Sequence, residues 1–167
     1  MKRRPRLTRA RLRELLRYNP KTGQFRWCKR PGGRHSPSAG HVSRQQDGRY
    51  FKIDGGMYSE HKLAWFYMTG RWCKPTIDHR DGNITNNRWN NLRRATASQN
   101  NANRRRPRHN TSGYKGVYRS RRSGQWCAHI GRNGQTIHLG TFPTPQAAHA
   151  AYLAAARKFF GEFARAE

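Results

Sequence analysis

The chain has 167 residues and is strongly basic, with 35 Lys and Arg against 8 Asp and Glu and a formal net charge of +27. Such a charge opposes compaction unless a polyanion offsets it, and nucleic acid is the expected polyanion. Trp, Tyr and Phe make up 11% of the residues, which disfavours a solvated tail. A membrane-surface protein is also disfavoured, because the sequence predicts no long basic amphipathic helix. The 34% hydrophobic content predicts one or two small domains.

The cysteines and the hydropathy pattern bear on the compartment. Cys28, Cys73 and Cys127 are far apart and form no C-x-x-C pair of the kind that binds zinc, and their odd number fits a reducing environment. No apolar run reaches 18 residues, and no signal-type hydrophobic region follows the basic start. The sequence therefore predicts a soluble, intracellular protein that is not secreted and has no membrane partner.

An N-terminal leader, residues 1–28, is predicted to form a helix followed by a short strand. Thr8 is a suitable N-cap, and Leu12, Leu15 and Leu16 share one helical face. The segment "NPKTG" ends this helix, and "QFRW" is typical of a strand. Residues 29–46 are rich in Gly, Pro, Ser and Arg, which predicts a basic loop that is exposed over nucleic acid or partly disordered.

The next module, residues 47–106, is predicted to contain a hairpin, a helix, and then a strand, loop, strand and helix. The hairpin turns at "DGG", and its helix runs from about Ser59 to Thr69. "PTIDH" and "NLRRAT" are the two later strands, separated by the polar loop "RDGNITNNRWN". "TASQ" matches a capping box, so the last helix should begin at Ala97.

Carboxylates are rare in this module, and their position indicates chemistry. Between His61 and Gly161 only Asp78 and Asp81 are acidic. Asp78 and Asn100 can supply two oxygen ligands to a hard divalent cation, with phosphate and water completing its shell. Mg²⁺ is the expected metal, and Mn²⁺ is the alternative. His79, on the other side of the strand, suits a general base at physiological pH.

A structural reading of the same residues stands beside the catalytic one. A lone Asp is often a turn or cap residue, a lone His is often merely packed or solvated, and Asn favours turns. Asp81-Gly82-Asn83 is assigned to this loop-forming role. The spacing, order and charge context of the remaining set favour catalysis.

The segment "IDHRDGNITNNRWNNLRRATASQN" resembles the HNH (ββα-metal) endonucleases, in particular the phage and intron-borne group whose last motif residue is Asn. The resemblance covers roughly residues 8–105 and implies hydrolysis of DNA to a 5′-phosphate and a 3′-hydroxyl. It also implies a role for each matched position. Asp78 and Asn100 correspond to metal ligands, His79 to the general base, Asn91 to the catalytic-site Asn that braces the loop and orients the histidine, and His61 to a structural histidine.

A basic linker, residues 107–112, is predicted to separate this module from a C-terminal domain. "YKGVYRS", "QWCAHIG" and "QTIHLGTF" are typical of three short strands, with a strong hairpin signal at Asn133-Gly134. Thr144 and Pro145 then begin an Ala-rich helix that Gly161 ends. The predicted fold class is α+β, with a ββα-metal module followed by a three-stranded antiparallel sheet packed on one helix.

Residues 113–164 resemble the ethylene-response-factor type (Apetala family) of DNA-binding domain, on the basis of Gly116-Val117, Trp126 and "LGTF". The resemblance implies a sheet that enters the major groove. Tyr118 stands where an arginine is usual, so the family's base specificity is not carried over. The expected DNA contacts come from the arginine run that leads into the linker and from the sheet: Arg104, Arg105, Arg106, Arg119, Arg121, Arg122, Trp126 and Arg132.

Together these features predict a metal-dependent endonuclease of double-stranded DNA, phage-borne or homing-like. It would act in the cytoplasm or nucleoid of a phage-infected bacterial host. One active site per monomer should nick, and a homodimer or two successive nicks would give a double-strand break. Two alternatives remain open: a non-catalytic, sequence-specific transcription regulator, and an RNA-binding or RNA-processing protein.

Overall fold

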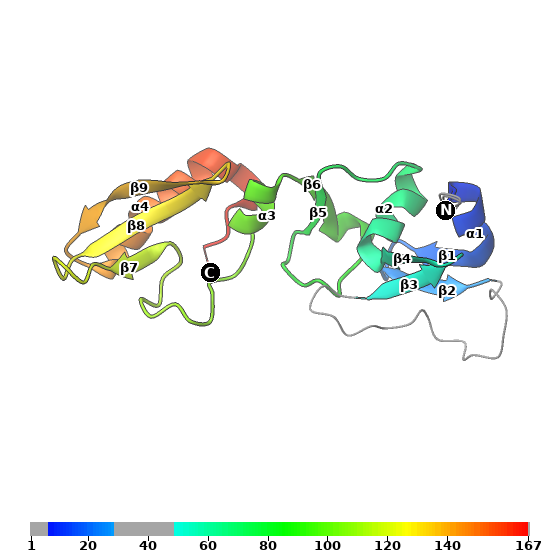
Figure 1. Cartoon of the computed structure of the whole chain (residues 1–167), viewed down its shortest axis with the longest axis horizontal. Helices are drawn as coiled ribbons and strands as arrows, with labels where there is room; N and C mark the ends of the chain where they lie inside the picture. The colour runs from blue at the N-terminus through cyan, green and yellow to red at the C-terminus, as the bar shows by residue number, and fades with distance from the viewer. Residues whose placement is uncertain (1–6, 29–48, 167) are drawn as a thin grey trace, which may run out of the picture. The chain divides into compact units, whose positions relative to one another are not determined.

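The computed structural model describes residues 7–28 and 49–166. The chain divides into two compact units, which meet between Arg94 and Ala95. Both are built from short helices and small antiparallel sheets, which confirms the predicted α+β class (Figure 1). The predicted loop over residues 29–46 lies outside the described residues. In the described part of the chain, no helix is long and apolar enough to cross a membrane.

The first unit begins with helix α1 (Arg9–Leu15) and the hairpin of β1 (Leu16–Asn19) and β2 (Gln24–Trp27). The Thr8 side chain accepts a hydrogen bond from the Arg11 amide at 3.1 Å and so caps α1 as expected. The prediction that Leu16 lies on the helix was wrong, because Leu16 has extended backbone angles and begins β1. Pairing of Leu16 with Trp27 keeps the leucine fully buried without a further helical turn.

A second hairpin, β3 (Tyr50–Ile53) and β4 (Gly56–Ser59), leads directly into helix α2 (Glu60–Thr69). Its two turn residues, Asp54 and Gly55, have φ angles of 47° and 77°. Two consecutive positive φ angles give a turn whose twist matches the paired strands. The hairpins and α2 enclose the core of this unit, which includes Leu12, Phe25, Phe51, Ile53, Leu63 and Phe66.

The sheet of β5 (Thr76–His79) and β6 (Leu92–Ala95) carries Asp78 and His79 on β5, with loop 80–91 between the strands. A short 3₁₀ turn, η1 (Trp89–Asn91), ends this loop. The first hairpin packs against the backbone of this loop. A Cβ on Gly23 (φ 75°) would lie 2.5 Å from the Asn87 carbonyl carbon, so only glycine permits this close approach.

The second unit contains a three-stranded sheet covered on one face by a long helix, as predicted (Figure 1). Ala148, Tyr152, Ala156 and Phe160 form the buried stripe of the helix. Small alanines permit close approach of helix and sheet. The elements of this unit are α3 (Ala97–Ala102), β7 (Val117–Arg119), β8 (Trp126–Arg132), β9 (Gln135–Phe142), α4 (Pro145–Phe160) and η2 (Gly161–Phe163).

Helix α3 is bound to the rest of the second unit by several contacts. Thr96 and Gln99 form the predicted capping box. The Asn133 amide donates to Ser98 Oγ at 2.8 Å, and Ala102 packs in the α4 core cluster. Burial lowers the pKa of Lys115 to about 8, and its ammonium donates to the Ala102 carbonyl. The compact units therefore meet before α3, whereas the boundary in the linker 107–112 stays a prediction.

Candidate functional site

Asp78 is buried near the end of β5 and is held by an arginine from β6. Its side chain is 4% exposed, and Arg93 Nε donates to Asp78 Oδ2 at 2.8 Å. A buried charge is tolerated when it is closely paired and hydrogen-bonded. Arg93 therefore fixes the position of the carboxylate that the sequence predicts as a metal ligand.

His79, the next residue, is also buried and contacts a network that reaches α2. Its Nε2 lies 2.9 Å from Asn87 Oδ1, and Asn87 Nδ2 donates to Glu60 Oε2 at 2.8 Å. Burial raises the pKa of Glu60, while the Arg49 charge and the Asn87 hydrogen bond act in the opposite direction. All three side chains of this chain of contacts are at least 90% buried.

Asn91 braces loop 80–91 through its side-chain amide, and the catalytic-site role that the resemblance implies for it stays a prediction. Its Nδ2 donates to Asp81 Oδ1 at 3.0 Å and to the Asn86 carbonyl at 2.7 Å, and its Oδ1 accepts from the Asp81 amide. Burial acts to raise the pKa of Asp81, but hydrogen bonds from Asn86, Asn83 and Asn91 and the nearby His79 lower it overall. Asp81 thus organises the loop and keeps its charge. The side chain seen against His79 itself is Asn87.

His61 lies on α2 with its ring edge-on to His79, at 5.4 Å between ring centroids. Burial lowers the pKa of His61 to about 4, with further contributions from the charges of His79 and Lys62. The imidazole is therefore neutral at physiological pH and serves as a packing wall for His79. The structural role that the resemblance implies for His61 stays a prediction.

The donors available to a metal are oxygen atoms of few side chains. Asp78 carries a carboxylate and Asn100, half-buried on α3, carries an amide, and both are hard donors of the kind that Mg²⁺ prefers. No cluster of three or more His, Cys, Asp or Glu suited to a metal occurs in residues 7–28 and 49–166. The donor set suits a cation whose shell is completed by substrate phosphate and water. Because Asn100 belongs to the second unit, its pairing with Asp78 stays a prediction.

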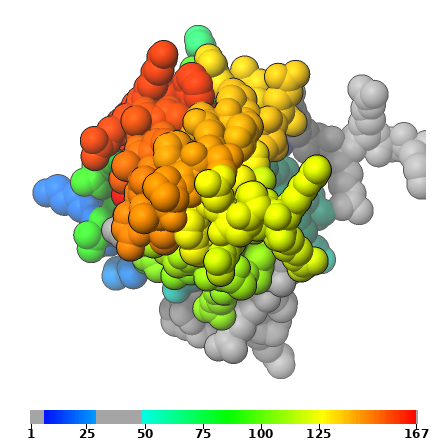
Figure 2. Space-filling model, turned by 90° about the vertical axis from the view of Figure 1, so that its left-hand side faces the viewer, coloured from blue at the N-terminus to red at the C-terminus, as the bar shows by residue number. Residues whose placement is uncertain are grey.

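The predicted DNA contacts of the second unit fall into two groups. Arg121 and Arg122 are exposed in the turn before β8. The side chains of the run 104–106, which precedes the linker, are exposed too. The region of this turn (yellow) projects from the surface in Figure 2. The other group, Arg119, Trp126 and Arg132, makes contacts with aromatic rings or with the core.

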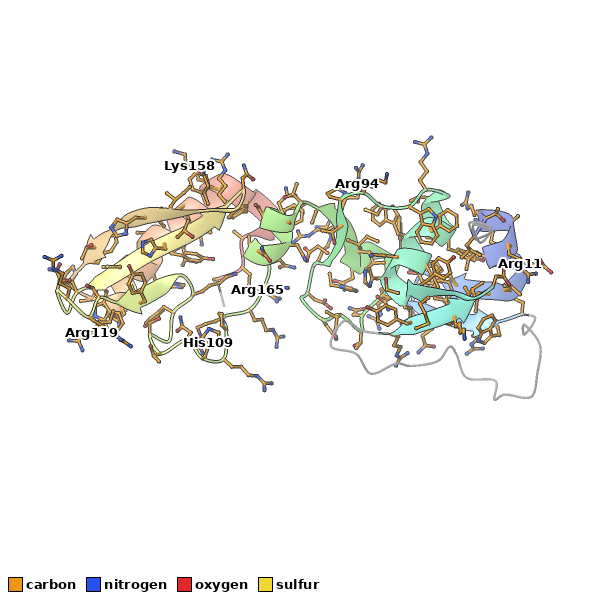
Figure 3. All side chains as sticks on the ribbon, in the orientation of Figure 1. Arg11, Arg94, His109, Arg119, Lys158 and Arg165 are labelled. Atoms are coloured by element: carbon orange, nitrogen blue, oxygen red, sulfur yellow. The ribbon has the colours of Figure 1, made fainter. Side chains whose placement is uncertain are left out.

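Three predicted contacts pack against rings or the core. The Arg119 guanidinium lies 5.9 Å from the Trp126 ring centroid, at the end of the sheet in Figure 3. Trp126 is half-buried against the Val117 cluster, and Arg132 lies 4.6 Å from the Phe159 ring of α4. All three side chains therefore make contacts within the second unit, and the two arginines also carry charge.

The exposed face of the sheet carries aromatic residues that were not predicted. Tyr118 stacks on His129 at 5.0 Å, and His138 Nδ1 lies 2.9 Å from His129 Nε2. Burial lowers the pKa of His129, and the His138 charge lowers it further. Strand alternation could have found this row, because Val117 and Ala128, the neighbours of Tyr118 and His129, face the core.

Comparisons with known proteins agree with this division of labour. Residues 58–102 match the sequence model of the HNH endonuclease family, and residues 112–162 match that of the AP2 domain. An uncharacterised HNH endonuclease of Acanthamoeba polyphaga mimivirus is 36% identical over 88 residues, which is 53% of this chain and 44% of the relative.

The AP2 segment is the more similar of the two. An APETALA2-like protein of Oryza sativa subsp. indica and an AP2-like ethylene-responsive transcription factor of Arabidopsis thaliana are each 48% identical over 58 residues, or 35% of this chain. The chain spans 13% and 12% of these relatives, and less than half of the viral one. No solved structure matches the chain. The chain thus contains one segment that is similar to HNH endonucleases and, after it, one that is similar to AP2 domains.

Proposed function

We propose that the protein is a metal-dependent endonuclease that cuts double-stranded DNA with its HNH module and holds the duplex with its AP2 domain. The observation that carries this proposal is the adjacent pair Asp78 and His79. Both are buried, each is fixed by its own partner, and they lie inside the segment that matches the HNH family. A pre-organised acid and base of this kind suits hydrolysis of a phosphodiester.

His79 is proposed to act as the general base. It accepts a proton from a water molecule as the water oxygen attacks phosphorus, the bond from phosphorus to the 3′ oxygen breaks, and the leaving 3′ oxygen takes a proton from solvent water. The products are a 5′-phosphate and a 3′-hydroxyl. Asn91 keeps loop 80–91 in shape through Asp81, so that the base stays in place while DNA binds.

Asp78 and Asn100 are the residues proposed to hold a divalent metal, with Mg²⁺ first and Mn²⁺ second. When bound, such a metal supplies positive charge beside the scissile phosphate and the leaving oxygen. Arg93 presents the Asp78 carboxylate in a fixed geometry. The scarcity of acids on this module avoids repulsion of the DNA backbone.

Exposed arginines of the second unit are proposed to position the duplex. Arg121 and Arg122 in the turn before β8 and the run 104–106 can neutralise phosphates, with release of counterions. One site per monomer is expected to nick, and a homodimer on DNA would cut both strands. A phage-borne or homing-like role inside a bacterial cell is part of the proposal; the viral relative is an HNH endonuclease of Acanthamoeba polyphaga mimivirus.

The decisive experiment is cleavage of supercoiled plasmid by wild type and His79→Ala, with Mg²⁺ or with EDTA, alongside a gel shift. Wild type should give nicked product only with metal, and the variant should bind DNA without cutting it. General-base catalysis supplies about 10²- to 10⁴-fold, so the loss should be of that order. His109→Ala removes an exposed histidine and serves as the matched control (Figure 3).

A binding-only protein is the alternative that the transcription-factor relatives suggest. In that case neither wild type nor His79→Ala would cut with any metal, while both would shift DNA. Single-stranded RNA as the better competitor in the gel shift would instead favour the RNA-binding alternative.

A further inference from the structure

We propose that Glu60 and Asn87 are positioning residues that fix the tautomer of His79 and make Nδ1 its basic nitrogen. The inference rests on the proposed nuclease function, since it assigns the atom that takes the proton from water. It concerns two residues that the motif resemblance did not single out, one at the start of α2 and one in loop 80–91.

The contact with Glu60 sets the orientation of the Asn87 side-chain amide. An amide offers N–H donors on one side and a carbonyl acceptor on the other. Asn87 Nδ2 lies 2.8 Å from Glu60 Oε2, where an ionised carboxylate can only accept a hydrogen bond. The Asn87 oxygen is thereby directed to His79. The reversed amide would place two oxygen acceptors against each other.

The orientation of the Asn87 amide decides which nitrogen of the His79 ring carries the hydrogen. Asn87 Oδ1 lies 2.9 Å from His79 Nε2, and a carbonyl oxygen cannot donate. Nε2 must therefore carry the hydrogen, and the in-plane lone pair of the neutral ring belongs to Nδ1. When water gives its proton to Nδ1, the charge that develops on the ring strengthens the Nε2–H···O bond to Asn87.

The orientation of the Asn87 side-chain amide depends on the charge of Glu60. The backbone amide of Glu60 donates to the Arg49 carbonyl at 2.8 Å, at the open end of the hairpin where Tyr50 pairs with Ser59. Burial raises the pKa of Glu60 above its ordinary value, while the positive charge of Arg49 and the hydrogen bond from Asn87 oppose this rise and favour the ionised form. An ionised Glu60 also stabilises the His79 imidazolium through the Asn87 side-chain amide.

A positioning role also requires that Asn87 be held rigidly. Asn87 is 2% exposed, and Tyr18 Oη donates to its carbonyl oxygen at 2.6 Å. The Trp89 amide donates to the Pro20 carbonyl at 3.0 Å. The first hairpin therefore holds the loop backbone at Asn87 and two residues after it, and the buried Asn87 side chain has little freedom to turn away from His79.

The test is ¹⁵N NMR of full-length protein labelled at histidine nitrogens, at a pH above the ordinary titration range of imidazole. The His79 signals, identified by their loss in His79→Ala, should show the Nε2–H tautomer in wild type. Glu60→Gln, which can face Asn87 with either end of its amide, should give a mixture of tautomers. A wild-type Nδ1–H tautomer would overturn the proposal.

Cleavage kinetics give a second readout. Asn87→Ala should lower kcat by about 10- to 100-fold, the range for partners that orient a working histidine, with KM unchanged. Glu60→Gln should fall between this variant and wild type. Asn90→Ala removes an exposed asparagine of the same loop and should leave kcat unchanged.

The two readouts separate the possible failures. A folded wild type that never cuts overturns the nuclease itself, whatever its tautomer. An active wild type with the Nδ1–H tautomer, or with full kcat in Asn87→Ala, overturns only the positioning role. Circular dichroism of each variant establishes that it is folded.

Discussion

The two units of this protein use arginine in opposite ways. In the first, Arg93 is 6% exposed and donates to a carboxylate in the middle of the proposed active site. In the second, Arg121 and Arg122 stand exposed in a turn, with no acidic residue in the chain between Asp81 and Glu162. The first arrangement fixes one atom in place, and the second leaves charge available to a partner.

This difference follows from what each task requires. Bond hydrolysis needs groups held in one geometry before the substrate arrives, which favours buried polar contacts. Binding a duplex needs cations that can meet phosphates, which favours exposed and mobile side chains. Substitutions in the first unit should therefore affect stability, and those in the second should affect binding and its salt dependence.

The largest effect is expected from Arg93→Met. The change removes a buried guanidinium from the Asp78 carboxylate, and loss of one member of a buried pair costs about 3–5 kcal/mol. Urea unfolding followed by tryptophan fluorescence measures it well, because Trp27, Trp65, Trp72 and Trp89 all lie in the first unit. The midpoint should fall clearly below that of wild type.

Two further variants sharpen the result. Arg93→Lys keeps the charge but loses the planar donor geometry, so its loss of stability should be smaller. Arg94→Met alters the exposed neighbour and should change the unfolding free energy by less than about 1 kcal/mol. Equal effects of Arg93→Met and Arg94→Met would contradict a buried structural pair.

An intermediate effect is expected from acid acting on His61. Its pKa is about 4 in the folded protein and 6.5 for an unperturbed side chain, so the unfolded state binds the proton more tightly. Stability should therefore fall as the pH drops from 6.5 towards 4, by at most roughly 3 kcal/mol from this group. His61→Gln should flatten that part of the pH profile of the urea midpoint. An unchanged slope would show that other histidines cause it.

Much of the fold could be predicted because local signals decided it. The capping box at Thr96 and Gln99, the Asn133-Gly134 turn and Pro145 at the start of α4 all act within a few residues. The end of α1 was not predictable in this way. Leu16 fits a helical face equally well, and only its pairing with Trp27 across the hairpin selects the strand.

The candidate site divides along the same line. Asp78 and His79 were singled out by the scarcity of acids and by their place on a strand, Asn91 by the resemblance to HNH endonucleases, and the structure buries all three. Glu60 and Asn87 were not singled out from the sequence. Asn87 differs from the other asparagines of the loop only in facing His79, and Glu60 contacts Asn87 from another element, α2. Contacts between segments far apart in sequence leave no mark in local spacing.

The smallest effect on stability is expected from the double variant Arg121→Ala/Arg122→Ala. Both side chains are exposed, so the unfolding free energy should change by no more than about 0.5 kcal/mol. Each phosphate contact contributes about 0.9 to the slope of log K against log salt concentration, so this slope should become less steep by about 2.

The matched control is Arg157→Ala/Lys158→Ala in the last turn of α4, which removes the same charge from the helix that covers the sheet (Figure 3). If the duplex is held by the turn before β8, this control should change the salt slope less than Arg121→Ala/Arg122→Ala does. Equal slopes for the two double variants would mean that net charge, rather than the position of the arginines, governs binding. The contrast between the two units would then be one of burial alone, because the exposed cations would hold DNA without fixing its register.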